Sequence, residues 1–302
     1  MKTLKVSVMA TAICAAMGFA VPASAGPSVT GAFVNGQQQW SDDSGEILID
    51  VDGSGGISKG DYLVGIVGMT SFPTSGVGVN TVTQLTAAFA TEVLSAPSAL
   101  PALACGNAAL TSCALFEFGA VALGFNHAWG LANAALGGLF TTTSFLAPSG
   151  GALDPATVAL FIEDNQAVPT AFDRDGGTMV NAFNTGSDGT VRVGVKMAPG
   201  DAWAGTGPAL LGQFFSVPSG TGVGSFSINA TIYDQNFPGY IFAPLITANG
   251  TLKPTSGSQF VVTDDTTFEV NIRKLPEPGT LALLGFGLLG LAGGSLKRRK
   301  MS

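Results

Sequence analysis

Apolar and polar residues alternate along several stretches in the second half of the chain. Around Val191, Val193 and Val195 every second residue is apolar, so these side chains share one face. A period of two residues is typical of a strand with one buried face. Sequences rich in Gly, Asp and Asn separate the stretches and predict turns. The predicted strands are residues 156–164, 189–197, 224–234 and 266–274.

The first half of the chain gives a less uniform pattern. Residues 45–68 predict two apolar strands around a Gly-rich turn. Residues 82–96 have apolar side chains at positions 82, 85, 89 and 93, a spacing that favours an amphipathic helix, although an extended segment fits the same residues. Residues 114–140 are rich in Ala and Gly and fit either a strand or a helix.

The composition supports a mainly β protein. Gly accounts for 42 of the 302 residues, about twice the usual share. Apolar residues make up 46 % of the chain and include 20 Phe, enough to build a packed core. We therefore expect a mainly β, sandwich-like extracellular domain over residues 26–274, with one or two helical excursions before residue 150.

Both ends of the chain look like targeting segments. Residues 1–25 contain a basic start, an apolar stretch and an Ala-Ser-Ala sequence, the pattern of a signal peptide that signal peptidase removes. Near the other end, residues 280–296 carry no charge and are just long enough for a transmembrane helix. Four basic residues follow and predict that the body lies outside the membrane. They are Lys297, Arg298, Arg299 and Lys300.

The last 28 residues resemble the PEP-CTERM sorting signal of Gram-negative bacteria. Pro276, Glu277 and Pro278 match its Pro-Glu-Pro motif, and the apolar segment and basic end follow in the same order. The resemblance implies a membrane-anchored precursor that an exosortase, a membrane-embedded transpeptidase-like enzyme, processes. It also implies a place at the cell surface or outside the cell, in association with biofilm and exopolysaccharide. The two prolines keep the segment around Glu277 extended, as a processing enzyme requires.

The charge of the body narrows the classes of partner. Six of the 13 basic residues lie in the two terminal segments, and 19 of the 20 acidic residues lie between them. Seven basic and 19 acidic residues leave the body with a formal charge near −12. Nucleic acids and anionic lipids bind to basic surfaces, so this charge argues against both as partners of the body.

The sequence DVDGSGGISKGD, residues 50–61, matches the spacing of a calcium-binding loop. Its terminal Asp resembles dockerin-like loops more than EF-hand loops and predicts weak binding, at about 10⁻⁴–10⁻³ M calcium. A plain hairpin turn explains the same residues, because Asp and Gly are turn formers and the flanks look like strands. Residues 173–177 repeat the pattern in a shorter form. The candidate ligands are Asp50, Asp52, Ser54, Gly56 and Asp61.

Two further residue types bear on chemistry. Cys105 and Cys113 are the only cysteines outside the signal peptide, and a pair in an exported protein predicts a disulfide. His127 is the only histidine and has no recognisable nucleophile motif beside it, so we expect it to be structural rather than catalytic.

These observations leave three functional hypotheses. The first is a non-enzymatic envelope or matrix protein with a structural or adhesive role. The second is an exported carbohydrate-active hydrolase, which requires a pair of carboxylates about 5–10 Å apart in a cleft. The third is a small-ligand-binding β protein, which an apolar cavity lined by Phe side chains would support.

Overall fold

The computed structural model describes residues 33, 35–72, 77–78, 84–164, 179–210, 213, 221–254 and 262–276. The signal peptide and transmembrane helix expected at the two ends, and the turn at residues 173–177, lie outside the described residues. Every helix in the described part of the chain falls short of the length and hydrophobicity that a membrane span requires.

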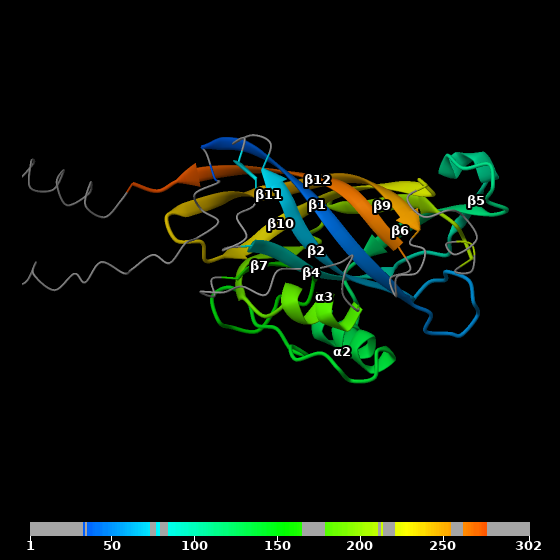
Figure 1. The fold of residues 1–302 in the computed structure, drawn as a ribbon, viewed down its shortest axis with the longest axis horizontal. Coiled ribbons are helices and arrows are strands. Elements are labelled where there is room, and N and C mark those ends of the chain that lie inside the picture. Colours follow the sequence, from blue (N-terminus) through cyan, green and yellow to red (C-terminus); the bar gives the residue numbers. More distant parts are fainter. Residues whose placement is uncertain are drawn as a thin grey trace, which may run out of the picture.

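Strands dominate the described part of the chain (Figure 1). The strands are β1 (Gly36–Ile49), β2 (Tyr62–Phe72), β3 (Val77–Gly78), β4 (Gln84–Val93), β5 (Ser98–Leu100), β6 (Cys113–Gly119), β7 (Thr157–Asp164), β8 (Thr190–Lys196), β9 (Ala202–Gly207), β10 (Gly224–Gln235), β11 (Tyr240–Pro254) and β12 (Val262–Lys274). The helices are η2 (Ala102–Cys105), α2 (Phe125–Ala135) and α3 (Met179–Gly186). The mainly β class is confirmed, and all of the predicted strands named above are present.

The strands form one sheet that closes on itself. The pairings run from β10 through β11, β12, β1, β2, β4, β7 and β8 and return to β10. Every pairing between the described strands is antiparallel. The expected two-sheet sandwich is therefore replaced by a barrel-like sheet. Alternation shows only that one face of each strand is buried, and the inner face of a sandwich and that of a closed sheet produce the same pattern.

Two pairs of strands share the space between β4 and β10. At one end β7 pairs with the first part of β4 and β8 with the last part of β10. At the other end β6 pairs with the last residues of β4 and β9 with the first part of β10. The register shifts in β1, β10 and β11 are sites where a strand can bend and the sheet can coil.

The prediction of a helix at residues 82–96 is wrong, because this segment is strand β4. Leu85, Ala87 and Phe89 point into the closed sheet, whereas Ala88 and Ala90 pack on its outside against the helical layer. Both faces of β4 are buried, so apolar residues occur at helical spacing as well as at every second position. Residues 114–140 divide into β6 and helix α2.

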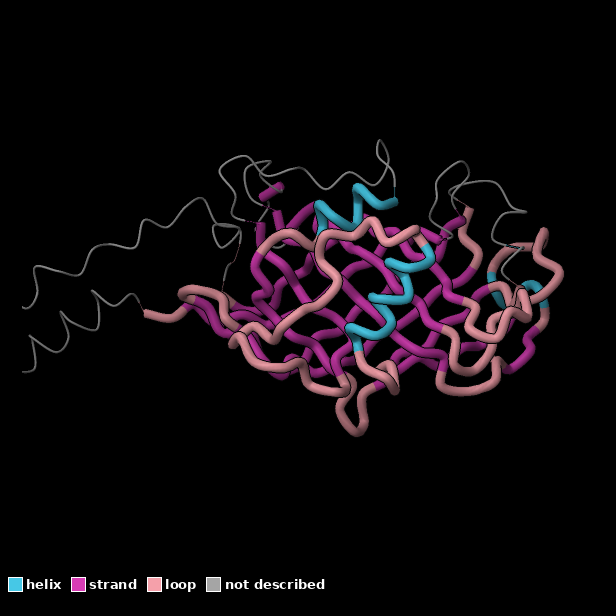
Figure 2. Tube along the Cα trace, turned by 90° about the horizontal axis from the view of Figure 1, so that it is seen from below, coloured by secondary structure: helices cyan, strands magenta, loops and turns pink. Residues whose placement is uncertain are grey.

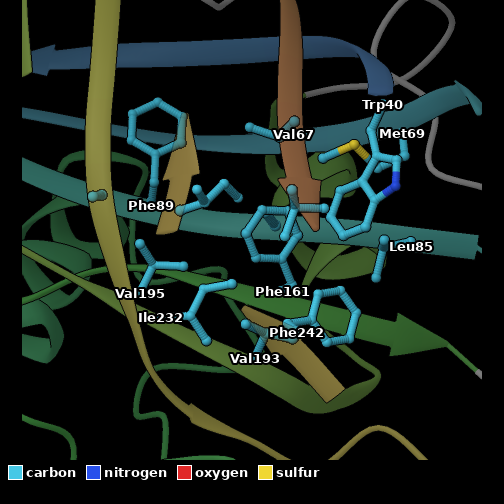
Figure 3. Packing of buried hydrophobic residues seen from close by; sticks show 14 of the residues in the cluster. Trp40, Val67, Met69, Leu85, Phe89, Phe161, Val193, Val195, Ile232 and Phe242 are labelled. Atoms are coloured by element: carbon cyan, nitrogen blue, oxygen red, sulfur yellow. The ribbon is translucent and has the colours of Figure 1, made fainter. Parts of the chain in front are cut away.

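The core lies in two layers separated by the strands. The inner layer fills the closed sheet and includes Trp40, Phe161 and Phe242 (Figure 3). The outer layer lies between the sheet and helices α2 and α3, where Trp129 and Phe183 are completely buried. The helices cover one side of the strands (Figure 2). The side formed by β10, β11 and β12 lies away from them (Figure 1).

Candidate functional site

The acidic loop, residues 50–61, joins β1 to β2. Each carboxylate of Asp50, Asp52 and Asp61 offers an oxygen that lies within 4.8 Å of the others. Asp50 is half-buried, Asp52 is exposed and Asp61 is only 2 % exposed. The loop therefore gathers three of the five predicted ligands at one point, with oxygen chemistry that suits calcium.

Backbone N–H groups hold these carboxylates in place. Asp50 accepts hydrogen bonds from the N–H groups of Ser54 (3.1 Å) and Gly55 (2.7 Å). Asp52 also accepts one from Ser54 N–H (2.9 Å), and hydrogen bonds from Ser54 and then from Ser58 lower the pKa of the Asp52 carboxyl. Gly55 has φ +72°, a conformation that allows the sharp turn.

The remaining predicted ligands lie in the same loop. The Ser54 hydroxyl donates a hydrogen bond to the carbonyl oxygen of Gly56, 3.4 Å away. Asp61 accepts hydrogen bonds from Val51 N–H (2.9 Å) and Ser58 N–H (2.6 Å) and thereby ties the two ends of the loop together. The flanking elements are strands, as expected for a hairpin, and the geometry of the loop is also compatible with a bound cation.

Backbone contacts fix the loop to the rest of the sheet. Ile57 N–H donates to the carbonyl oxygen of Ala209 (2.9 Å), and Gly60 N–H donates to that of Val93 at the end of β4 (2.9 Å). The Ile57 side chain is buried in a small core at this end of the molecule, beside Cys105 and Cys113. The structure joins these two cysteines by a disulfide with Cα atoms 5.9 Å apart.

His127 lies on helix α2. Its side chain is exposed, and its ring meets the edge of the Tyr62 ring at a centroid distance of 6.2 Å. This position gives His127 a contact with the sheet and leaves it on the surface of the helical layer.

A second feature is a broad polar surface on β10, β11, β12 and β1, which the sequence pattern did not reveal. We call it the polar face. Its side chains meet in cross-strand rows, one of which runs Ser227, Asn249, Thr267 and Ser41, and the next Asn229, Thr247, Glu269 and Gln39. Glu269 is the only charged residue in these two rows. Its carboxylate accepts hydrogen bonds from the side-chain amides of Gln37 (2.9 Å) and Gln39 (3.0 Å).

The closed sheet also contains an apolar cavity of about 70 Å³. Aromatic side chains, among them Phe89, Phe118 and Trp203, form much of its wall. Glu46 also lines it, from β1. Asp42, Ser44 and Glu46 are polar residues at every second position of β1, and all three are buried. The sequence shows this spacing, but only the closed sheet shows that these side chains point inward.

The fold defines a disulfide-containing closed-sheet domain that ends just before the Pro-Glu-Pro sequence. β12 ends at Lys274, and the next residue, Leu275, donates its N–H to the carbonyl oxygen of Gly239 (2.8 Å). Pro276 is exposed. The rest of the predicted sorting segment, Glu277, Pro278 and Lys297–Lys300, lies outside the described residues.

Residues 275–299 match the PEP-CTERM protein-sorting motif, so the chain carries this motif at its C-terminal end. The resemblance found in the sequence is thereby confirmed for the tail. The motif indicates an exported protein that an exosortase processes at the membrane of a Gram-negative bacterium. No curated protein and no solved structure matches the chain.

Proposed function

We propose that this protein is a non-enzymatic component of the cell envelope or extracellular matrix, and that its polar face binds a neutral exopolysaccharide. The observation that carries the proposal is the cross-strand arrangement of hydroxyl and amide side chains on β10, β11, β12 and β1. The sorting motif supplies the location, because it indicates export and processing at the membrane.

The chemistry of the polar face suits a polymer rich in hydroxyl groups. Hydroxyl and carboxamide side chains both donate and accept hydrogen bonds, as sugar hydroxyls do. Neighbouring strands lie about 4.8 Å apart, and alternate residues along a strand about 6.8 Å apart. The rows therefore present hydrogen-bonding groups at regular intervals, and an extended chain can use many of them at once. Multiple weak contacts of this kind add up along a polymer.

Charge favours a neutral polymer over an acidic one. The body carries a formal charge near −12 from seven basic and 19 acidic residues. An anionic polysaccharide would therefore be repelled at low ionic strength. A neutral polysaccharide meets no such repulsion and finds a single carboxylate, Glu269, in the two central rows.

Co-sedimentation of the exported protein with an insoluble neutral exopolysaccharide tests this proposal. The triple variant Asn229→Ala, Asn249→Ala and Thr267→Val removes hydrogen-bonding groups from three strands. We expect binding to fall about tenfold or more, since each net hydrogen bond contributes about 0.5–1.5 kcal/mol. A matched control, Thr143→Val with Asn181→Ala, changes polar residues on the helical side and should bind like the wild type.

Two outcomes contradict the proposal. Equal binding by the triple variant and the control would show that the polar face takes no part in polysaccharide binding. Release of new reducing ends from the polysaccharide would show a hydrolase instead of a binding protein.

We further propose that the acidic loop binds calcium outside the cell. The proximity of the Asp50, Asp52 and Asp61 oxygens, within 4.8 Å of one another, supports it. Because the loop bonds to β4 and to Ala209, binding should stabilise this end of the sheet by mass action.

Thermal unfolding in EGTA and in millimolar calcium tests the calcium proposal. We expect calcium to raise the Tm of the wild type and to leave that of Asp50→Asn/Asp52→Asn unchanged. Glu117→Gln, which neutralises an exposed carboxylate on β6, should keep the full calcium response. Identical Tm values of the wild type in both buffers would show that the loop is a hairpin turn without a calcium site.

A further inference from the structure

The cavity inside the closed sheet is central rather than superficial. Its lining comes from strands all around the ring, and Phe89, Phe161 and Val195 converge there (Figure 3). Phe226 and Ile228 of β10 and residues of β11 and β12 complete the wall. A ligand in this space would be surrounded by nearly the whole circumference of the sheet.

The size of the cavity limits what it can hold. Its volume is about 70 Å³, about half that of an engineered cavity of about 150 Å³ that holds benzene. A molecule of a few non-hydrogen atoms, or the end of a short alkyl chain, fits this space. The aromatic and aliphatic lining favours an apolar body, since burial of apolar surface stabilises by about 25 cal/mol per Å².

One carboxyl group interrupts the apolar wall. Glu46 lines the cavity and is 2 % exposed. Its Oε1 accepts a hydrogen bond from the hydroxyl of Ser44, 2.7 Å away, which is itself completely buried. A carboxyl group has about four acceptor positions on its two oxygens, so the Ser44 hydroxyl does not use up the hydrogen-bonding capacity of Glu46.

Charge-assisted hydrogen bonds are stronger than neutral ones, and a low-dielectric interior strengthens them further. An amine or hydroxyl group that enters this cavity would therefore be oriented toward Glu46. A ligand carboxylate would lose its hydration in the apolar cavity and would find a second carboxyl group instead of a cationic partner, so it should be excluded.

We propose that the cavity binds a small apolar molecule with one amine or hydroxyl group, and that this group donates a hydrogen bond to Glu46. The site is separate from the polar face, which lies on the opposite surface of the same strands. This inference therefore stands independently of polysaccharide binding.

Methyl NMR of the exported protein, titrated with 1-butylamine, 1-butanol and butanoate, tests the proposal. These compounds share a short alkyl chain and differ in the head group. We expect the amine and the alcohol to shift the methyl signals of Leu63 and Val67, which line the cavity. Val64 and Ile66 on the same strand pack on the outer face and should not respond. Butanoate should shift none of them.

Two variants locate the binding site. Ala87→Val adds two methyl groups to the cavity wall and should weaken binding of both the amine and the alcohol at least tenfold. Ala88→Val, its neighbour on the outer face of β4, controls for overpacking and should bind normally. Glu46→Gln preserves the shape of the side chain and should weaken binding of the amine more than binding of the alcohol.

The proposal is overturned if neither butylamine nor butanol shifts the lining methyl groups, or if Ala87→Val binds like the wild type. If butanoate binds as tightly as butylamine, Glu46 does not anchor the ligand. Loss of binding in Ala88→Val but not in Ala87→Val would place the compounds under the helices instead.

Discussion

At the residue scale, several glycines make room for aromatic rings from neighbouring strands. A Cβ on Gly65 would lie 2.5 Å from the ring of Phe89, its cross-strand partner. A Cβ on Gly250 would lie at the same distance from the ring of Phe226. Both rings line the cavity. The high Gly content therefore has a packing role inside the sheet, as well as a role in turns.

The substitution Gly65→Ala should destabilise the protein. The added methyl group must displace the Phe89 ring and also approaches the carbonyl oxygen of Gly45 at 2.9 Å. Overpacking of this kind costs about 1–3 kcal/mol, and urea unfolding would measure it.

Gly130→Ala is the matched control for that experiment. No atom lies within 4 Å of a Cβ at this position on α2, and Ala favours the helix by up to about 1 kcal/mol. Equal stability of the Gly65→Ala protein and the wild type would contradict the packing shown around Phe89.

Individual residues differed in how far the sequence predicted them. The proximity of Asp50, Asp52 and Asp61 was predictable because all three lie within twelve residues of sequence and the chain itself brings them together. Glu46 was not, because its inward direction depends on partners in β2 and β12 that are distant in the sequence. The polar face could not be predicted for the same reason, since its rows combine residues from four strands.

At the scale of elements, β4 shows why periodicity misled at residues 82–96. A strand with one buried face gives a period of two, but β4 packs against the inner core and against the helices. Small Ala residues on the outer face leave space for α2 and α3. The four strands predicted after residue 150 were clearer because turns rich in Gly and Asp delimit them.

The disulfide should stabilise the end of the sheet where η2 meets β6. Cys105 and Cys113 are eight residues apart, and closure of so small a loop contributes about 2–3 kcal/mol in the chain-entropy model. We expect Cys105→Ala/Cys113→Ala to lower the free energy of unfolding by about this amount, measured by urea denaturation.

A reducing agent provides the control for the cysteine variant. It should lower the stability of the wild type and leave that of the double variant unchanged. An unchanged wild type under conditions in which thiol titration shows full reduction would contradict a stabilising role for this bond.

At the scale of the whole molecule, closure of the sheet separates three environments. The interior is apolar and contains the cavity, one outer side is covered by helices, and the polar face lies on the side away from them (Figure 1). The sequence predicted the β class and the sorting signal, but not the closure. Closure depends on β10, which pairs with β11 on one side and with β8 and β9 on the other.

The sorting motif predicts how the whole protein is processed. Glu277→Ala should cause the precursor to accumulate at the membrane, because it removes the charged residue of the Pro-Glu-Pro sequence. Mass spectrometry of membrane and extracellular fractions would measure this. Glu269→Ala, in the domain itself, should be processed normally. Normal processing of the Glu277 variant would show that the enzyme does not require this carboxylate.

Polysaccharide binding by the polar face is tested most directly by an NMR titration of the exported protein with a soluble neutral exopolysaccharide, observed through side-chain amide signals. We expect the signals of Asn229 and Asn249 to shift together. The signals of Asn126 and Asn184, on the helical side, should stay in place. Shifts confined to the helical side, or none at all at saturating polysaccharide, would contradict a binding role for the polar face.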